Sequence, residues 1–521
     1  MTRTTLLAAT LTAATALTPV FAQSVLRLDE VAVGELDPAK ASDYADSILM
    51  FNVYDTLVLP KQGEPGHEGH LAESWEVDGA TYTFTLRDGI AFQSGNPLTA
   101  QDVVYSLERM QAVGQGLSHL FGGVAAEAVD EKTVRFTLEE PYAPFVASLV
   151  RLPIVDKALV EQNATEQDPW GEAFLSGNAA GTGAYRVTAH NPQAETRMAR
   201  NEDYFGEIKD AAPDEAVLRY SLEAATVRTL LAQGEHDISS QWLPPEVMRA
   251  LANDGAQLFT ESGTGAFYIK LNTAKPPLDH VNCRQALAHA FDYGTALQMV
   301  AITEDVSSGS APTGAIPVGM FGANPAEEAL ARDMDKAREY LADCPTPPED
   351  WDLEISWIAE VPLEERFALL MQANFAELGI SSKIETLPWA LFTERVASPE
   401  NTPHISQIFV NAVTGDPDTL LYGMYHSSTP GTWQSPEYLD DAEVDAALEA
   451  GRRGPGEQER EEAYSALNDR LMELAPTIYG YDRQSVFAAS DRVSAPALSD
   501  PSQAFGVDGM GFSFRLMEMT D

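Results

Sequence analysis

The sequence predicts a mixed α/β protein with more than one domain, and three observations lead to that prediction. In residues 82–86, aromatic and aliphatic side chains alternate with threonines, which is the period-two pattern of a half-buried strand. Apolar residues recur at helical spacing over 363–378, Gly379 follows as a helix terminator, and 381–387 has the pattern of a strand. Helix followed by strand is typical of an α/β unit. The length of 521 residues exceeds what one hydrophobic core usually serves.

The N-terminal residues have the pattern of a secretory signal peptide. Arg3 forms a short positive segment, and 6–17 is a run of Leu, Ala and Thr that is too short to span a bilayer. Ala22 ends a small-residue cleavage site before Gln23. We therefore expect cleavage after Ala22 and a periplasmic location. No Cys follows the site, so a lipid-anchored form is not expected.

Residues 71–109 predict a strand, a turn and a capped helix in that order. The SGNP run at 94–97 supplies turn residues after the strand. Thr99 has the position of an N-cap, with Asp102 three residues on. The apolar stripe of the helix is then formed by Val103, Val104, Leu107 and Met110.

Two glycine-rich stretches are predicted connections between domains. Residues 174–187 are rich in Gly and small residues before a strand, and 262–275 combine a flexible approach, a strand and a polar turn. Each stretch contains a GTG triplet. Neither triplet has the third glycine and the following helix of a dinucleotide site, so both predict hinges.

The chain is strongly acidic. Its net charge of −46 excludes nucleic acid as a partner, because nucleic-acid binding needs a basic surface. The acidic residues are spread along the chain, so they do not indicate disorder. Two interpretations remain open: a solvated acidic surface suited to a salty environment, and steering of a cationic ligand.

Cys283 and Cys344 are the only cysteines. An even count in an exported chain permits one disulfide. Both cysteines lie at the ends of predicted helices, 282–291 and 335–343, and two buried free thiols are the alternative. Their spacing matches no metal-ligand pattern.

Motifs of catalysis or cofactor binding are few. The sequence has no Gly-Lys pair, hence no P-loop, and no G-x-S-x-G motif. HEGH at 67–70 is one residue short of the zinc motif H-E-x-x-H, and its Gly and Pro neighbours predict a loop. We therefore expect no enzyme activity, metal or cofactor. A secreted hydrolase is the less favoured alternative.

An ordered series of short segments extends from residue 36 to 425: LDP at 36–38, LAESW at 71–75, PLTAQDVVYSLER at 97–109, TVRFTLEEPYAPF at 133–145, GTGAYR at 181–186, RNEDYFG at 200–206, LNTAKPPLDHVNCRQALAHAFD at 271–292, MDKAREYLAD at 334–343 and DPDTLLYGMY at 416–425. Each segment is a weak signal alone. The series in this order closely resembles the bacterial extracellular solute-binding proteins of the oligopeptide/dipeptide/nickel class (family 5), which feed ABC importers.

The resemblance implies an α/β, two-lobed periplasmic-binding-protein fold of the class II (cluster C) type. It implies mixed sheets, an extra inserted domain, a hinge between the lobes, and a ligand in the crevice between lobes I and III. We expect a monomer that binds a small-molecule ligand and delivers it to an inner-membrane ABC permease. The expected divisions are signal peptide 1–22; lobe I at 23–60, 180–268 and 484–521; inserted domain II at 61–179; and lobe III at 269–483.

A closing cleft needs aromatic walls and a few fixed polar groups. Trp242 and Trp389 are candidates for the walls, with core packing as the alternative for each. Arg366 begins the long helix off its apolar stripe, and in dipeptide-binding relatives a comparable Arg pairs with the ligand carboxylate. The other expected ligand-facing residues follow the LDP motif, flank the two crossings between lobes, or lie in the DPD turn: Ser42, Asp43, Tyr44, Tyr268, Asn272, Tyr481, Asp416 and Asp418.

One departure from the peptide-binding pattern concerns the ligand. Peptide-binding relatives carry a Trp and an Asp shortly before the DPD turn, and that Asp holds the ligand's α-amino group. This chain has NAVTG at 411–415 instead. Asp43, Asp416 and Asp418 are the candidate replacements. We expect a peptide or an amino-acid-derived solute, with an oligosaccharide, opine, metal chelate or haem as alternatives.

Overall fold

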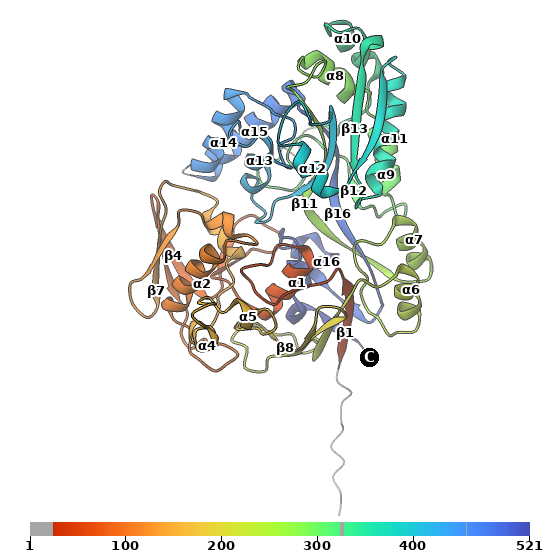
Figure 1. Cartoon of the computed structure of the whole chain (residues 1–521). Helices are drawn as coiled ribbons and strands as arrows, with labels where there is room; N and C mark the ends of the chain where they lie inside the picture. The colour runs from red at the N-terminus through yellow and green to blue at the C-terminus, as the bar shows by residue number, and fades with distance from the viewer. Residues whose placement is uncertain (1–23, 324–327, 455, 521) are drawn as a thin grey trace, which may run out of the picture.

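The computed structural model describes residues 24–323, 328–454 and 456–520. Figure 1 shows an upper lobe, a lower lobe, and a third part at the lower left. A sheet of four or more strands forms the centre of each part. We call them lobe III, lobe I and domain II. The predicted signal peptide and the cleavage site at Ala22 lie outside the described residues.

Lobe I is built on a mixed sheet. β1 and β10 run parallel, whereas β10 pairs with β9 and β9 with β8 in antiparallel fashion. Leu26 and Leu28 of β1 share one buried core with Ile48 and Leu49 of the first helix. The sheet order is β1 (Val25–Glu30), β10 (Glu215–Tyr220), β9 (Glu195–Arg200) and β8 (Tyr185–Asn191), and the helices are α1 (Tyr44–Val53), α6 (Ala224–Ala232), α7 (Pro245–Asn253) and α16 (Pro496–Ser499), with a small pair of strands, β17 (Val493–Ser494) and β18 (Glu518–Met519).

Domain II is an antiparallel sheet covered by the predicted capped helix. The sheet order is β4 (Ala72–Asp78), β5 (Thr81–Leu86), β7 (Thr133–Thr137) and β6 (Ala125–Ala128), beside the hairpin β2 (Val58–Pro60) and β3 (His67–Gly69). The helices are α2 (Ala100–Val113), α3 (Phe145–Ser148), α4 (Lys157–Asn163) and α5 (Glu172–Leu175). Thr99 and Asp102 form the predicted capping box of α2, with the Thr99 backbone N–H donating to Asp102 Oδ2 at 2.9 Å. The predicted helix stripe is buried.

Lobe III has a six-stranded mixed sheet in the order β12 (Gly309–Ser310), β16 (Thr477–Ala489), β11 (Gln257–Leu271), β15 (Ile405–Asn411), β13 (Asp352–Ile358) and β14 (Ser381–Leu387). Its helices are α8 (Val281–Ala290), α9 (Tyr293–Val300), α10 (Met334–Ala342), α11 (Leu363–Ala376), α12 (Trp389–Arg395), α13 (Asp418–Tyr425), α14 (Ala442–Arg453) and α15 (Glu457–Leu474). The predicted helix and strand at 363–378 and 381–387 are therefore confirmed as α11 and β14. Gly379 has a φ of 79°, as a helix terminator requires.

Two long antiparallel strands, β11 and β16, connect the lobes (Figure 1). Both pass through the predicted crossing points near 268 and 483. The glycine-rich start of 262–275, predicted as a flexible approach to a strand, is itself part of β11, which has a register shift there between Ser262 and Ala266. Gly265 allows β11 and β15 to pack closely, since a Cβ at this position would lie 2.1 Å from the Val410 carbonyl oxygen of β15.

Domain II is fixed to lobe I by a buried ion pair and a shared core. Asp37 of the LDP motif accepts two hydrogen bonds from Arg109, the last residue of the SLER motif, at 2.7 and 2.6 Å. The apolar core of domain II also includes residues of the C-terminal segment of lobe I: Ala497, Phe505, Val507 and Met510.

The two cysteines are joined in lobe III. Cys283 of α8 and Cys344, just after α10, form a disulfide with a Cα–Cα distance of 5.1 Å. The structure thus favours the bridged alternative over two free thiols.

Candidate ligand-binding site

The parallel strands of lobe III end at one edge of its sheet. β13 runs parallel to both β14 and β15, and each of the three leads through a short loop into a helix. Ligands of open α/β sheets bind at the carboxyl ends of such strands. Arg366, Trp389 and Asp416 all follow these ends.

Lobe I has the same arrangement on its own sheet. β1 and β10 are parallel, and Ile238 forms a further parallel bridge with Leu28. The chain leaves β1 at Glu30 and continues through the 31–43 loop to α1. After the bridge at Ile238, the chain continues through a second loop at 239–242. These two loops carry the predicted residues Ser42, Asp43 and Trp242, and the predicted Tyr44 is the first residue of α1.

Contacts show that the loops of the two lobes face each other. Asn411, at the end of β15, donates from Nδ2 to Asp508 Oδ2 of lobe I at 3.0 Å. Arg366 of α11 and Glu246 of α7 form an ion pair across the lobes at 3.6 Å. We call the region between these two sets of loops the interlobe junction.

A buried polar network supports the lobe I side of the junction. Glu261 of β11 accepts hydrogen bonds from the Tyr44 hydroxyl at 2.5 Å and from the backbone N–H groups of Gly509 and Gly511. Burial, with Asp508 nearby, raises the pKa of Glu261 to about 7. Tyr44 therefore holds the start of α1 in place. Glu261 and Asp508 were not predictable from the sequence, because the partners of Glu261 lie more than two hundred residues away and Asn411 lies 97 residues before Asp508.

Two neighbouring polar side chains at the junction have unmatched atoms. Glu30 is 2% exposed, its Oε2 accepts the Val31 N–H at 3.3 Å, and its Oε1 has no hydrogen-bond partner in the described part of the chain. Gln241 accepts from Arg483 and Ser485 through Oε1, but its Nε2 lacks an acceptor among the described residues.

The environment of Glu30 disfavours its charged form. Burial is the largest cause, and together with Asp29 it raises the pKa of Glu30 to about 8. The Ser240 hydroxyl and the Gln241 backbone lie close enough to moderate this rise. Glu30 and Gln241 are thus each left with one unmatched buried atom, which is costly unless a bound group satisfies it.

The two predicted tryptophans are unusually exposed. Trp242 in lobe I is 57% exposed, with the Arg483 guanidinium 5.0 Å from its ring centroid. Trp389 in lobe III is 41% exposed and contacts Trp433 edge-on at 5.5 Å. Exposed rings at the carboxyl ends of both sheets match the aromatic walls of a closing cleft.

Several other predicted residues have structural roles. Tyr268 and Tyr481 are buried in the apolar cores, and the Tyr268 hydroxyl donates to the Ala315 carbonyl. Asn272 is buried and donates to the Pro399 carbonyl oxygen. Ser42 and Asp43 are exposed, and Asp43 is the N-cap of α1. We therefore leave Tyr268, Tyr481 and Asn272 out of the proposed site.

The acids of the DPD turn are already paired. Asp416 accepts two hydrogen bonds from Arg460 at 2.8 and 2.7 Å. Asp418 accepts from Arg452 at 3.0 and 3.1 Å and from the Tyr142 hydroxyl of domain II at 2.7 Å. Neither carboxylate is free to replace the missing ligand-binding Asp.

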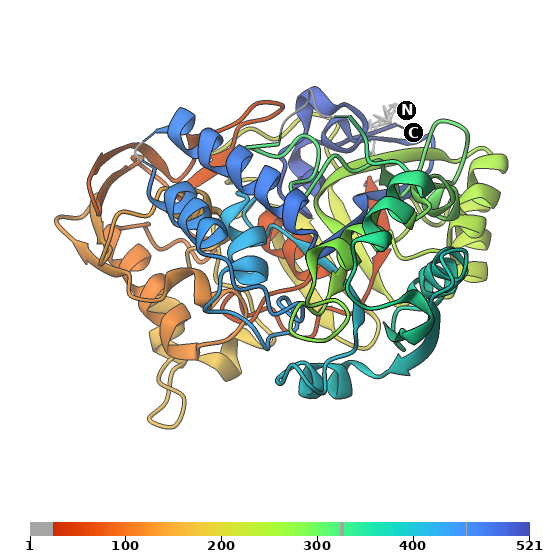
Figure 2. The same ribbon diagram turned by 90° about the horizontal axis from the view of Figure 1, so that it is seen from above.

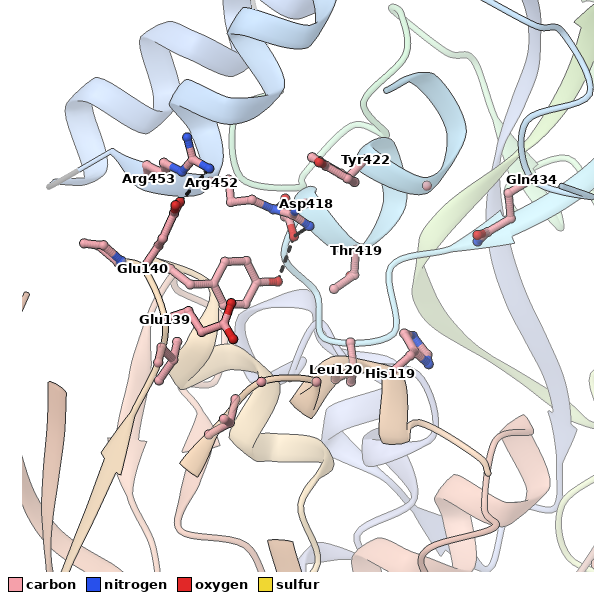
Figure 3. A pocket seen from close by; sticks show the side chains of 17 residues that line it. His119, Leu120, Glu139, Glu140, Asp418, Thr419, Tyr422, Gln434, Arg452 and Arg453 are labelled. Carbon is pink, nitrogen blue, oxygen red and sulfur yellow. Dashed lines mark hydrogen bonds and ion pairs between the residues drawn. The ribbon is translucent and has the colours of Figure 1, made fainter. Parts of the chain in front are cut away.

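Two cavities lie between domain II and lobe III. One, of about 510 Å³, lies between the DPD helix and the 119–124 and 138–142 segments of domain II (Figure 3). The other, of about 470 Å³, lies where domain II and lobe III meet the C-terminal segment of lobe I. Figure 3 shows that charged side chains line the first cavity from both sides.

The described residues contain no group of three or more His, Cys, Asp or Glu side chains placed to hold a metal ion. A search of the same residues for a bilayer-crossing helix finds none with the necessary length and apolar character.

A family model described as bacterial extracellular solute-binding proteins, family 5, matches residues 67–432. The chain belongs to this family. It is 27% identical over 468 residues to the probable D,D-dipeptide-binding periplasmic protein DdpA of Escherichia coli, covering 88% of each chain. It is also 27% identical to heme-binding protein A of Haemophilus influenzae, covering 82% of this chain and 81% of that one.

A solved structure has the same fold. HbpA2 from Haemophilus parasuis matches with a TM-score of 0.82 and 25% identity, covering 95% of this chain and all of that one. The predicted two-lobed α/β fold and the family 5 membership are therefore confirmed. Proteins of this family bind solutes outside the cytoplasm, and this chain is a solute-binding protein of that kind.

Proposed function

We propose that this protein captures a peptide or an amino-acid-derived solute at the interlobe junction and delivers it to an inner-membrane ABC permease. The proposal includes export to the periplasm, with a signal peptide cleaved after Ala22, and no catalytic role. Family membership supports the receptor role. The name of the Escherichia coli relative supports the ligand class.

The pair of unmatched atoms at Glu30 and Gln241 carries the proposal for the ligand. A peptide or amino acid offers an N–H or ammonium donor close to a carbonyl or carboxylate acceptor. Glu30 Oε1 would accept from the donor, and Gln241 Nε2 would donate to the acceptor. A bound ammonium would also favour the charged form of Glu30.

The remaining predicted residues fit around this pair. Trp242 and Trp389 would cover the ligand from lobe I and lobe III. Arg366 would exchange its partner Glu246 for an anionic group of the ligand, since an ion pair between half-exposed side chains is weak. Binding would then close the lobes about β11 and β16, a hinge motion.

A non-peptide solute is the second candidate. It is favoured by the absence of the Asp that precedes the DPD turn in peptide-binding relatives, and by the equal identity to a heme-binding protein. Native mass spectrometry can separate the two candidates. The mature protein would be offered a pool of di- and tripeptides, haem, and oligosaccharides in separate samples.

The proposal expects peptide adducts with the peptide pool and none with the oligosaccharides. Retention of haem or an oligosaccharide with no peptide adduct would assign the protein to the second candidate. The same spectra give the mass of the mature chain, which should begin at Gln23.

A further inference from the structure

Domain II contacts lobe I and lobe III through two boundaries that differ in chemistry. Its boundary with lobe I contains a shared apolar core and the buried pair of Asp37 and Arg109. Among the described residues, that core includes none from lobe III. The boundary with lobe III consists of polar contacts and both cavities. A polar, incompletely packed boundary is the kind that separates when domains move.

One group of polar contacts at this second boundary centres on Asp418, and elsewhere along it Arg151 of domain II donates from Nε to the Val413 carbonyl oxygen of lobe III at 2.5 Å. The Tyr142 hydroxyl of domain II donates to Asp418 Oδ2, and Arg452 of lobe III pairs with the same carboxylate. The Ala143 backbone N–H donates to the Arg452 carbonyl at 2.9 Å. Arg453 forms an ion pair with Glu140 at 2.7 Å on the rim of the cavity (Figure 3).

Both ribbon views place α14 and α15 on the side of lobe III nearest domain II (Figures 1 and 2). Arg452 is near the end of α14, with its guanidinium 3.4 Å from the ring centroid of Tyr422. Asp418 remains paired with Arg452 when domain II moves away, because both belong to lobe III. Opening therefore loses the Tyr142 hydrogen bond without leaving a bare buried charge.

We propose that Tyr142, Asp418 and Arg452 form an interdomain lock that positions lobe III in the closed arrangement. Domain II moves with lobe I as one body, and the lock forms and breaks each time the interlobe junction closes and opens. The DPD turn thus acts on the open–closed equilibrium through domain II, not by touching the ligand. The role in solute capture rests on the proposed function, whereas the lock is defined by domain positions alone.

The lock can be tested without a ligand by measuring the distance between domain II and lobe III. Exposed Thr137 on β7 and Gln458 on α15 accept spin labels after Thr137→Cys and Gln458→Cys substitution. Pulsed dipolar spectroscopy then gives the closed and open populations. Tyr142→Phe should lower the closed-to-open ratio by about tenfold, since it removes a hydrogen bond to a charged group.

Tyr422→Phe is the matched control. It also removes one tyrosine hydroxyl beside the same cavity, but that hydroxyl donates to Glu449 within lobe III. It should leave the distance distribution unchanged. Glu140→Gln should change the ratio by less than about threefold, because the pair with Arg453 is exposed.

An unchanged distribution in Tyr142→Phe would overturn the lock. An equal shift in Tyr142→Phe and Tyr422→Phe would also overturn it, because it would show a general loss of packing. A ligand, once known, gives a second readout. Where the open form dominates, the apparent dissociation constant of Tyr142→Phe should rise by the same factor as the closed-to-open ratio falls. Failure to find any peptide ligand would remove the proposed function and leave the distance measurement valid.

Discussion

Lobe III contacts lobe I at the interlobe junction and domain II at a second boundary. The two surfaces differ in whether their buried polar and charged side chains have partners within the protein. At the interlobe junction, Glu30 and Gln241 keep unmatched atoms, and Trp242 and Trp389 are exposed. At the boundary with domain II, the acids of the DPD turn are fully paired with Arg460 and Arg452. The first surface keeps unmatched polar atoms, whereas the carboxylates of the second are paired within the protein.

This difference distinguishes carboxylates that are available to a ligand from carboxylates that stabilise the fold. A buried carboxylate with an arginine partner contributes to structure and resists exchange of that partner. A buried carboxylate without one is available to a ligand. The predictions below test whether the two surfaces can be disturbed independently.

The largest expected effect is on stability at the DPD turn. Asp416→Asn should lower the free energy of unfolding by about 3 kcal/mol, because it leaves the charge of Arg460 without its partner at a site where both side chains are mostly buried. Urea unfolding measures this loss. Ligand affinity should stay within about twofold, because Asp416 pairs with Arg460 inside lobe III and not with the proposed ligand.

Asp335→Asn is the control for Asp416→Asn. Asp335 pairs with Arg338 on the surface and is fully exposed, so its loss should leave stability unchanged. If Asp416→Asn abolished binding at unchanged stability, the DPD turn would belong to the ligand site after all.

The next effect is on affinity at the junction. Trp242→Ala combined with Trp389→Ala should weaken ligand binding by about a hundredfold or more, since aromatic anchors commonly contribute about 2 kcal/mol each. Isothermal titration calorimetry measures this change. The thermal midpoint of the ligand-free protein should hardly move, because both rings are exposed. Val77→Ala, an equally exposed apolar position on domain II, should bind like the parent.

A third prediction concerns pH. Burial raises the pKa of Glu30 to about 8 in the folded protein, from the ordinary value of 4.5. Between these values the unfolded chain releases a proton that the folded protein keeps, so the free energy of unfolding should fall as pH rises from about 5 to 8. Glu30→Gln should reduce that fall by about 3 kcal/mol.

Urea unfolding of parent and variant at both ends of this range checks the third prediction. Glu364, whose pKa is also raised to about 8 by burial, remains in both proteins and cancels in the comparison. An identical pH dependence of the two proteins would show that Glu30 is not held in its neutral form.

The smallest effect concerns the rim of the junction. Arg366→Ala should weaken binding of a carboxylate ligand by about tenfold, the value of one charge-assisted hydrogen bond. Glu246→Gln, which frees Arg366 from its pair, should bind as tightly as the parent or a few times more tightly. Parent-like binding by Arg366→Ala would direct the search to neutral solutes held by Trp242 and Trp389.

Local features of the fold were predictable from the sequence. The capping box of Thr99 and Asp102 and the succession of α11 and β14 depend on neighbours within a few residues. The glycine-rich start of β11 was not predictable as a strand, because its hydrogen-bond partners lie in β16 and β15, far along the chain.

The site was predictable only in part. Trp242 and Trp389 were candidates for cleft walls, with core packing as the alternative, and only the structure shows that both rings are exposed. Tyr268 is buried through contacts that only the assembled lobes create. No neighbouring residue in the sequence marks Glu30 as part of a ligand site. Its proposed role depends on Gln241, which lies near it only in the folded chain.

A crystal structure of the protein with a bound peptide from the native mass spectrometry pool would locate the ligand. We expect ligand density between Trp242 and Trp389, with a ligand nitrogen within hydrogen-bond distance of Glu30. We also expect no peptide in the cavity between domain II and lobe III. Density in that cavity, or contact with Asp416 or Asp418 in place of Glu30, would exclude the interlobe junction as the ligand site.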